Sequence, residues 1–371
     1  MKKILLLLIT VFLAYLTAFY VTGTKNGYQN PLDFEKIFNN LDSLKSLKKN
    51  SDFEKGLENL DNSEYDKAMI NFKNALKEEN TDENNYYVGY TYFQKQDYKN
   101  ALVYFNTATN LNSENSDAWL QKGITEYYQN NYQEAINDLF FCTELIPEES
   151  QAYYYLSLCY EAQGKIEVAL QSAETAVEYD STDSESWFEA ANLAYSIQNY
   201  SKSIKYYKKV LEILPKDKYT ELNLGLAYNK SGNKDSALFW YTKTIEDYPD
   251  YSLAYNNKGY IYQTEGKYQS AISYYTKSIK LDIKNTYPIW NRADCYFELK
   301  EYEKAIKDYK KAYEIKPEYY NALWYIGLCH EKLNNKKDAI LNFKDFIKNA
   351  NTDNEYYQEA IQKIKINESS K

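Results

Sequence analysis

The chain has 371 residues, a formal net charge of −9 and 43 tyrosines. An acidic balance argues against broad binding to nucleic acid or to anionic membranes, because both need clustered lysine and arginine. The acidic excess is concentrated between residues 116 and 183, which hold 13 acidic and 2 basic side chains. Two interpretations of this region stay open: a surface that binds a basic partner, or a solvated outer face.

The first residues differ in composition from all that follow. Lys2 and Lys3 precede an uncharged stretch from Ile4 to Val21. This stretch is at the short end of what spans a bilayer and is long for the core of a signal peptide. We expect residues 1–21 to be an uncleaved transmembrane anchor or a removed signal peptide. Both export the remainder of the chain to the periplasmic or extracellular side, as a membrane-bound or a secreted protein.

Two short segments connect this stretch to the main part of the chain. Residues 22–31 have the composition of a flexible linker. Residues 32–48 are amphipathic, with Phe34, Ile37 and Leu41 at helical spacing. We expect a helix that caps the next segment; a short dimerising coiled coil is the alternative, although two heptads are few for one.

Residues 49–353 repeat one pattern nine times. Large side chains lie three before and four after a small residue, and glycines lie twelve or five before it. Such offsets are helical, and small residues allow close helix packing. Glycine five before is expected between two helices, where a left-handed backbone is needed. The small residues are spaced by 33 and then by 34 residues: Ala68, Ala101, Ala135, Ala169, Ser203, Ala237, Ala271, Ala305 and Ala339.

This pattern resembles the tetratricopeptide repeat. Trp119 and Trp187 match the leading aromatic residue of that family, and Tyr92, Tyr160 and Tyr228 match the tyrosine of its first helix. The resemblance implies an all-α fold, an α-solenoid of stacked antiparallel helix pairs that forms a superhelix. Residues 354–371 are expected to add a C-terminal capping helix and a tail.

The sequence offers little for catalysis. His330 is the only histidine, and it stands where the repeat places a packing residue. The cysteines occupy small-residue positions, although Cys142 and Cys159 could form a disulfide in an exported protein. We therefore predict that the protein is not an enzyme and binds no cofactor or metal.

The resemblance also implies where a partner would bind. In this family the concave wall is lined by first-helix side chains, which here lie 18, 15, 11, 8 and 7 residues before each small residue. A third of these positions are aromatic. They give the candidate groove residues Tyr86, Tyr90, Phe93, Tyr127, Tyr128, Tyr154, Phe188, Tyr195, Tyr219, Tyr260, Tyr287, Trp290, Phe297 and Trp324.

From these features we expect a non-catalytic scaffold for protein–protein interaction. Its groove would hold a peptide segment or an amphipathic helix of a partner, in assembly of an envelope complex or in secretion. Recognition of a glycan or another small ligand by the aromatic rings is the alternative. Packing of several of these rings against the next repeat is equally compatible with the sequence, which gives no indication of the oligomeric state.

Overall fold

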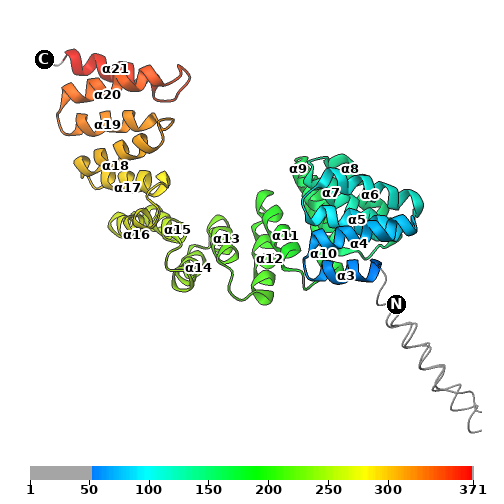
Figure 1. Ribbon diagram of the computed structural model, residues 1–371. Coiled ribbons are helices and arrows are strands. Elements are labelled where there is room, and N and C mark those ends of the chain that lie inside the picture. The colour runs from blue at the N-terminus through cyan, green and yellow to red at the C-terminus, as the bar shows by residue number, and fades with distance from the viewer. Residues whose placement is uncertain (1–51, 370–371) are drawn as a thin grey trace, which may run out of the picture. The chain divides into compact units, whose positions relative to one another are not determined.

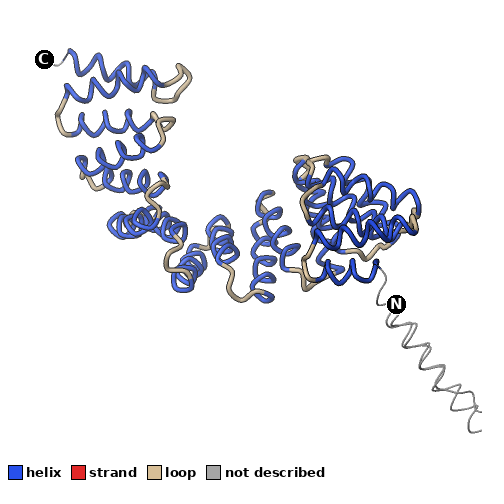
Figure 2. Tube along the Cα trace, viewed as in Figure 1, coloured by secondary structure: helices blue, strands red, loops and turns tan. Residues whose placement is uncertain are grey.

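The computed structural model describes residues 52–369, and within that range every regular element is a helix (Figures 1 and 2). The segments predicted at 1–21, 22–31 and 32–48 lie outside it. None of the helices between Asp52 and Ser369 is long and apolar enough to cross a membrane. The helices are α3 (Asp52–Asp61), α4 (Tyr65–Glu78), α5 (Asp82–Gln94), α6 (Tyr98–Leu111), α7 (Ser116–Tyr128), α8 (Tyr132–Leu145), α9 (Ser150–Ala162), α10 (Ile166–Tyr179), α11 (Ser184–Ser196), α12 (Tyr200–Ile213), α13 (Lys218–Lys230), α14 (Lys234–Asp247), α15 (Ser252–Thr264), α16 (Tyr268–Leu281), α17 (Thr286–Glu298), α18 (Tyr302–Ile315), α19 (Asn321–Lys332), α20 (Lys336–Asn349) and α21 (Tyr357–Ser369).

The helices from α3 to α20 form consecutive antiparallel pairs. We call the first, odd-numbered helix of each pair the A helix and the second the B helix. The chain divides into two compact units, one ending at Gln121 and one beginning at Lys122, inside α7. In the first unit α4 packs against α5; in the second each B helix from α8 to α20 packs against the helix that follows it. The predicted all-α architecture of stacked helix pairs is confirmed.

One kind of turn joins the two helices of every pair. After α5, the Asp97 N–H donates to the Tyr92 carbonyl (2.9 Å) and the Gln96 N–H to the Phe93 carbonyl (2.8 Å). These two bonds define a Schellman motif, which requires a left-handed residue in the turn. That residue has φ between 58° and 87° in all nine pairs: Ser63, Gln96, Asn130, Gly164, Gln198, Gly232, Gly266, Lys300 and Asn334.

The glycines inside the A helices are explained by close packing and not by the backbone conformation. A Cβ built on Gly225 would lie 2.5 Å from Cε1 of Tyr241, and one on Gly327 would lie 2.5 Å from Cε1 of Phe343. Each of these rings projects from the paired B helix and is fully buried. The absent side chain on the A helix therefore makes room for the large ring that fills the centre of the repeat.

The single arginine of the chain ties two repeats of the second unit together. The guanidinium of Arg292 makes a bidentate pair with the Asp308 carboxylate, at 2.7 and 2.8 Å. Its remaining nitrogen donates to Thr276 Oγ1 at 2.9 Å, on the B helix of the preceding pair. At the same two repeat positions Lys122 makes an ion pair with Asp138 at 2.9 Å. These ion pairs are largely buried, and they fix the A helix on its B helix.

Candidate functional site

In each of the two units, we define the A-helix face as the surface formed by the outward side chains of its A helices. Thirteen of the fourteen candidate groove residues keep part of their surface exposed. Tyr128, Tyr219, Tyr260 and Tyr287 are the most exposed, at 45%, 54%, 47% and 61%. The half-buried ones are Tyr86, Tyr90, Phe93, Tyr127, Tyr154, Phe188, Tyr195, Trp290 and Phe297.

Trp324 does not belong to this face, and its assignment as a groove residue was wrong. The indole is 2% exposed, because the ring of Tyr356, just before α21, stacks on it with centroids 5.3 Å apart. One repeat earlier, the position equivalent to Tyr356 is Ala322, whose small side chain leaves Trp290 open. The C-terminal segment therefore covers in the last repeat a position that stays accessible elsewhere.

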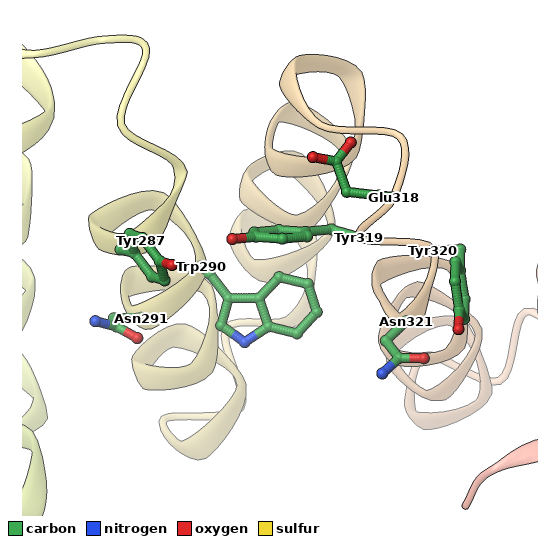
Figure 3. Close-up of a pocket in the computed structure, with 7 residues that line it drawn as sticks. All are labelled: Tyr287, Trp290, Asn291, Glu318, Tyr319, Tyr320 and Asn321. Atoms are coloured by element: carbon green, nitrogen blue, oxygen red, sulfur yellow. The ribbon is translucent and has the colours of Figure 1, made fainter. Parts of the chain in front are cut away.

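A pocket of about 330 Å³ opens between the A helices α17 and α19, and we call it the α17 pocket. Figure 3 shows Trp290 projecting from α17 beside Tyr319, with Tyr320 and Asn321 on the α19 side. The rings of Tyr309 and Tyr325 pack against the Trp290 ring, at centroid distances of 5.2 and 5.6 Å, and hold it in place. The lining residues are Tyr287, Trp290, Asn291, Glu318, Tyr319, Tyr320 and Asn321.

The same repeat positions form a second pocket three repeats earlier, which we call the α11 pocket. It has about 250 Å³ and lies between α11 and α13, with Tyr154 of α9 at its edge. Glu185, Phe188 and Glu189 stand where the α17 pocket has Tyr287, Trp290 and Asn291. The remaining lining residues are Ser184, Val210, Leu214, Asp217, Tyr219 and Thr220.

Glu189 is the unusual residue of the α11 pocket. Its side chain is 9% exposed, and its Oε1 has no hydrogen-bond partner within the described residues. Burial, and to a smaller degree the charge of Glu161, raises the pKa of Glu189 to about 7. A carboxyl group with this pKa is half protonated near neutral pH, and it would be fully ionised beside a cation.

The unit that ends at Gln121 has a pocket at the same repeat positions. This α5 pocket has about 310 Å³, with Glu83, Tyr86 and Tyr87 in place of Glu185, Phe188 and Glu189. Asp82, Asn115 and Asp117 complete it. Pockets thus recur at equivalent repeat positions in both units. The α5 and α11 pockets are each lined by three acidic residues, whereas the α17 pocket has one, Glu318, beside the side-chain amides of Asn291 and Asn321.

A second row of pockets lies further along the A helices. One of about 460 Å³ lies between α15 and α17 and includes Tyr260, Asp294 and Phe297; another, of about 180 Å³, includes Tyr195. The Tyr309 hydroxyl donates to Asp294 Oδ1 at 2.6 Å, and burial raises the pKa of Asp294 to about 6. In the two rows together, nine of the candidate residues line a pocket: Tyr86, Tyr154, Phe188, Tyr195, Tyr219, Tyr260, Tyr287, Trp290 and Phe297.

The sequence prediction missed two groups of lining residues. The first stands fourteen before the small residue of its repeat and includes Glu189 and Asn291. The second precedes the next A helix and includes Asp217 and Tyr319. The signal that could have found Glu189 is a lone carboxylate in the run WFEAANLAY, where the surrounding residues are those of a buried helix face.

The residues weighed for catalysis lie apart from these pockets. His330 is half-buried in the last turn of α19, and burial lowers its pKa. All four cysteines, Cys142 and Cys159 among them, are buried, and none of them forms a disulfide. No group of three or more His, Cys, Asp or Glu residues in the described part of the chain is arranged to hold a metal ion. The pockets on the A helices present aromatic rings and carboxylates, which are groups that can bind a ligand.

Comparison with known proteins identifies the repeats. Models of the tetratricopeptide repeat match residues 120–178, 160–218, 219–251, 252–285, 291–319 and 321–350. A model of subunit 3 of the anaphase-promoting complex, or cyclosome, matches residues 61–142.

Solved structures of other proteins show a similar fold over parts of the chain. One is of MamA, with 21% identity over 43% of this chain and 87% of that one, and a TM-score of 0.41. Another is of YrrB, described as a TPR protein with an unusual peptide-binding site, with 21% identity, 50% and 95% coverage and a TM-score of 0.41. A repeat protein of Parabacteroides merdae gives 20% identity, 67% and 98% coverage and a TM-score of 0.49. The repeat matches extend over more than half of the sequence, and from them we conclude that the chain is a tetratricopeptide-repeat protein.

Proposed function

We propose that this protein is a non-catalytic scaffold that holds an extended segment or an amphipathic helix of a partner protein along its A-helix face. The observation that carries the proposal is the recurrence of pockets at equivalent repeat positions. A linear partner can place successive side chains in successive pockets. Exposed tyrosine rings add contact area at a small cost in side-chain entropy.

We further propose that the repeats act outside the cytoplasm. The support is the uncharged stretch from Ile4 to Val21 behind two lysines. If the stretch is retained, it tethers the scaffold to the cell membrane, where the protein would take part in assembly of an envelope complex or in secretion. If it is cleaved, the scaffold is secreted. The mass of the mature protein in membrane and soluble fractions distinguishes the two.

Recognition of a glycan is the second candidate function. The α17 pocket favours it, because the Tyr287 and Trp290 rings stand beside the side-chain amides of Asn291 and Asn321. Aromatic rings can stack on the apolar faces of sugars while amides bind their hydroxyl groups. Soluble glycans that change the tryptophan fluorescence of the full chain, and that compete with the protein partner, would support this candidate.

Two exposed aromatic rings provide a matched test of the scaffold. Tyr287 lies on A helix α17 and Phe239 on B helix α14, and both are 61% exposed. We expect Tyr287→Ala to weaken capture of the native partner by about tenfold, which is about 1.4 kcal/mol. Phe239→Ala should leave capture unchanged.

The measurement is quantitative co-purification from the cells that make the protein, together with thermal melts. The melts should show that both variants fold, because neither ring is part of a buried cluster. Equal capture by the two variants and the parent chain would reject the A-helix face as the working surface.

A further inference from the structure

The α11 pocket contains an acidic group whose own partner is missing within the described residues. Glu189 is nine-tenths buried and lines the pocket, and its Oε1 accepts no hydrogen bond from the described residues. A buried carboxylate without a partner is costly, and proteins generally pair such a group with a cation or a donor. A bound molecule could therefore supply the cation or hydrogen-bond donor that Glu189 lacks among the described residues.

All the charged residues that line the pocket around Glu189 are acidic. Ten described residues line it, and none of them is basic. Glu185 lies at its rim, and Asp217 adds a carboxylate whose Oδ2 accepts the Thr220 N–H at 2.7 Å. The neighbouring sequence from residue 116 to 183 carries a large excess of acidic residues, as described above. This charge would attract a basic ligand and disfavour an acidic one.

Three aromatic rings form the walls of the pocket. They belong to Tyr154, Phe188 and Tyr219, on three successive A helices. An ammonium or guanidinium group gains energy over the face of such a ring. Tyr219 already takes part in one such contact, because the Lys218 ammonium lies 5.0 Å from its ring centroid. The pocket combines a buried carboxylate at one side with rings that suit the alkyl part and the charge of a basic side chain.

We propose that the α11 pocket binds a lysine or arginine side chain of the partner segment, with Glu189 as its counter-ion. This inference rests on the proposed function and specifies its ligand. The α17 pocket has the neutral Asn291 where Glu189 stands, so it would take an aromatic or amide side chain instead. Of these two pockets, the α11 pocket therefore requires a basic residue in the partner segment and the α17 pocket does not.

A display library of random decapeptides, selected against the full chain, tests this inference. The variants are Glu189→Gln, which keeps the shape of the pocket, and Glu167→Gln, which removes the same charge from an exposed position of α10. We expect the parent chain and Glu167→Gln to select peptides with one fixed lysine or arginine. Glu189→Gln should lose that preference and keep the others.

A selected peptide, resynthesised with norleucine in place of the basic residue, gives the magnitude. We expect its affinity to fall by about tenfold on the parent chain and to change little on Glu189→Gln. Peptides without a fixed basic residue whose binding is weakened by Tyr287→Ala would overturn the inference and leave the scaffold function standing. Selection of the same basic residue by Glu189→Gln would also overturn it. A library that yields no binders would contradict both.

Discussion

At the scale of single residues, the turn inside each helix pair shows how the sequence tolerates strain. All nine turns have a left-handed residue, but only Gly164, Gly232 and Gly266 are glycines. An L-residue in this conformation costs about 1 kcal/mol or more, because its Cβ crowds the following carbonyl. The repeated Schellman hydrogen bonds hold the backbone in this conformation at the other six positions.

Exchanges at two of these turns test that cost. Lys300→Gly should raise the free energy of unfolding by about 1 kcal/mol, because glycine relieves the strain at φ 61°. Gly266→Ala should lower it by a similar amount, of about 1 kcal/mol. Urea unfolding followed by circular dichroism measures both changes. A loss of stability in Lys300→Gly would show that the Lys300 side chain contributes more than its backbone costs.

The raised pKa of Glu189 predicts that its contribution to the free energy of unfolding depends on pH. Its pKa of about 7 in the folded chain exceeds the value of 4.5 expected when it is exposed. Between these values the folded chain binds the proton more tightly than the unfolded chain. The contribution of Glu189 is therefore most favourable below pH 4.5 and is lost as the pH rises to about 7. Glu189→Gln should raise the free energy of unfolding by about 2 kcal/mol at pH 8 and by little at pH 4.5.

Urea unfolding at the two pH values measures this difference, with Glu167→Gln as the control for a change of net charge. The control should alter stability equally, and slightly, at both. If Glu189→Gln raises the free energy of unfolding equally at pH 4.5 and pH 8, the carboxyl group of Glu189 titrates normally in the folded parent chain.

At the scale of helices, the ion pairs between A and B helices offer a comparison within the chain. The ammonium of Lys122 forms an ion pair with Asp138. At the same repeat position, the guanidinium of Arg292 forms two hydrogen bonds to Asp308 and a third to Thr276. Arg292→Lys should cost about 1 kcal/mol, since one ion pair of the Lys122 type remains. Arg292→Ala should cost about 3–5 kcal/mol, because Asp308 is only 4% exposed and loses both hydrogen bonds from the guanidinium.

Urea unfolding of the two variants tests this ranking. A double variant, Arg292→Leu with Asp308→Leu, should recover much of the loss, because it removes the buried charge together with its partner. If Arg292→Ala costs no more than Arg292→Lys, the ion pair between Arg292 and Asp308 does not stabilise the packing of α17 on α18.

The helices themselves were predictable from the sequence because small residues must recur wherever two helices approach closely. The same regularity hides the exceptions. Four of the left-handed turn residues, Ser63, Gln96, Gln198 and Lys300, carry side chains that give no sign of their backbone conformation. Trp324 matched the groove pattern, and only the three-dimensional packing shows that Tyr356 covers it. Glu189 lies between the positions that face outward and those that face the core, so periodicity alone assigns it to neither.

At the scale of the whole molecule, the repeats form a regular helical framework, and the residues that line the pockets differ from one pocket to another. Stability in such a protein is close to a sum of repeat and neighbour terms, so changes in one pocket should leave distant repeats folded. Replacement of Glu189 or Tyr287 therefore alters recognition locally. The pockets can accordingly be assigned separate ligand side chains, which is what a scaffold for an extended partner requires.

The most direct test of the partner-binding face is photo-cross-linking in the cells that make the protein. Benzoylphenylalanine would replace Tyr287 on α17 in one variant and Phe239 on α14 in another, since the two rings are equally exposed. We expect one dominant cross-linked partner protein from position 287, identified by mass spectrometry, and a much weaker product from position 239. Cross-links to the same protein of equal yield at both positions, or from position 239 alone, would contradict this expectation.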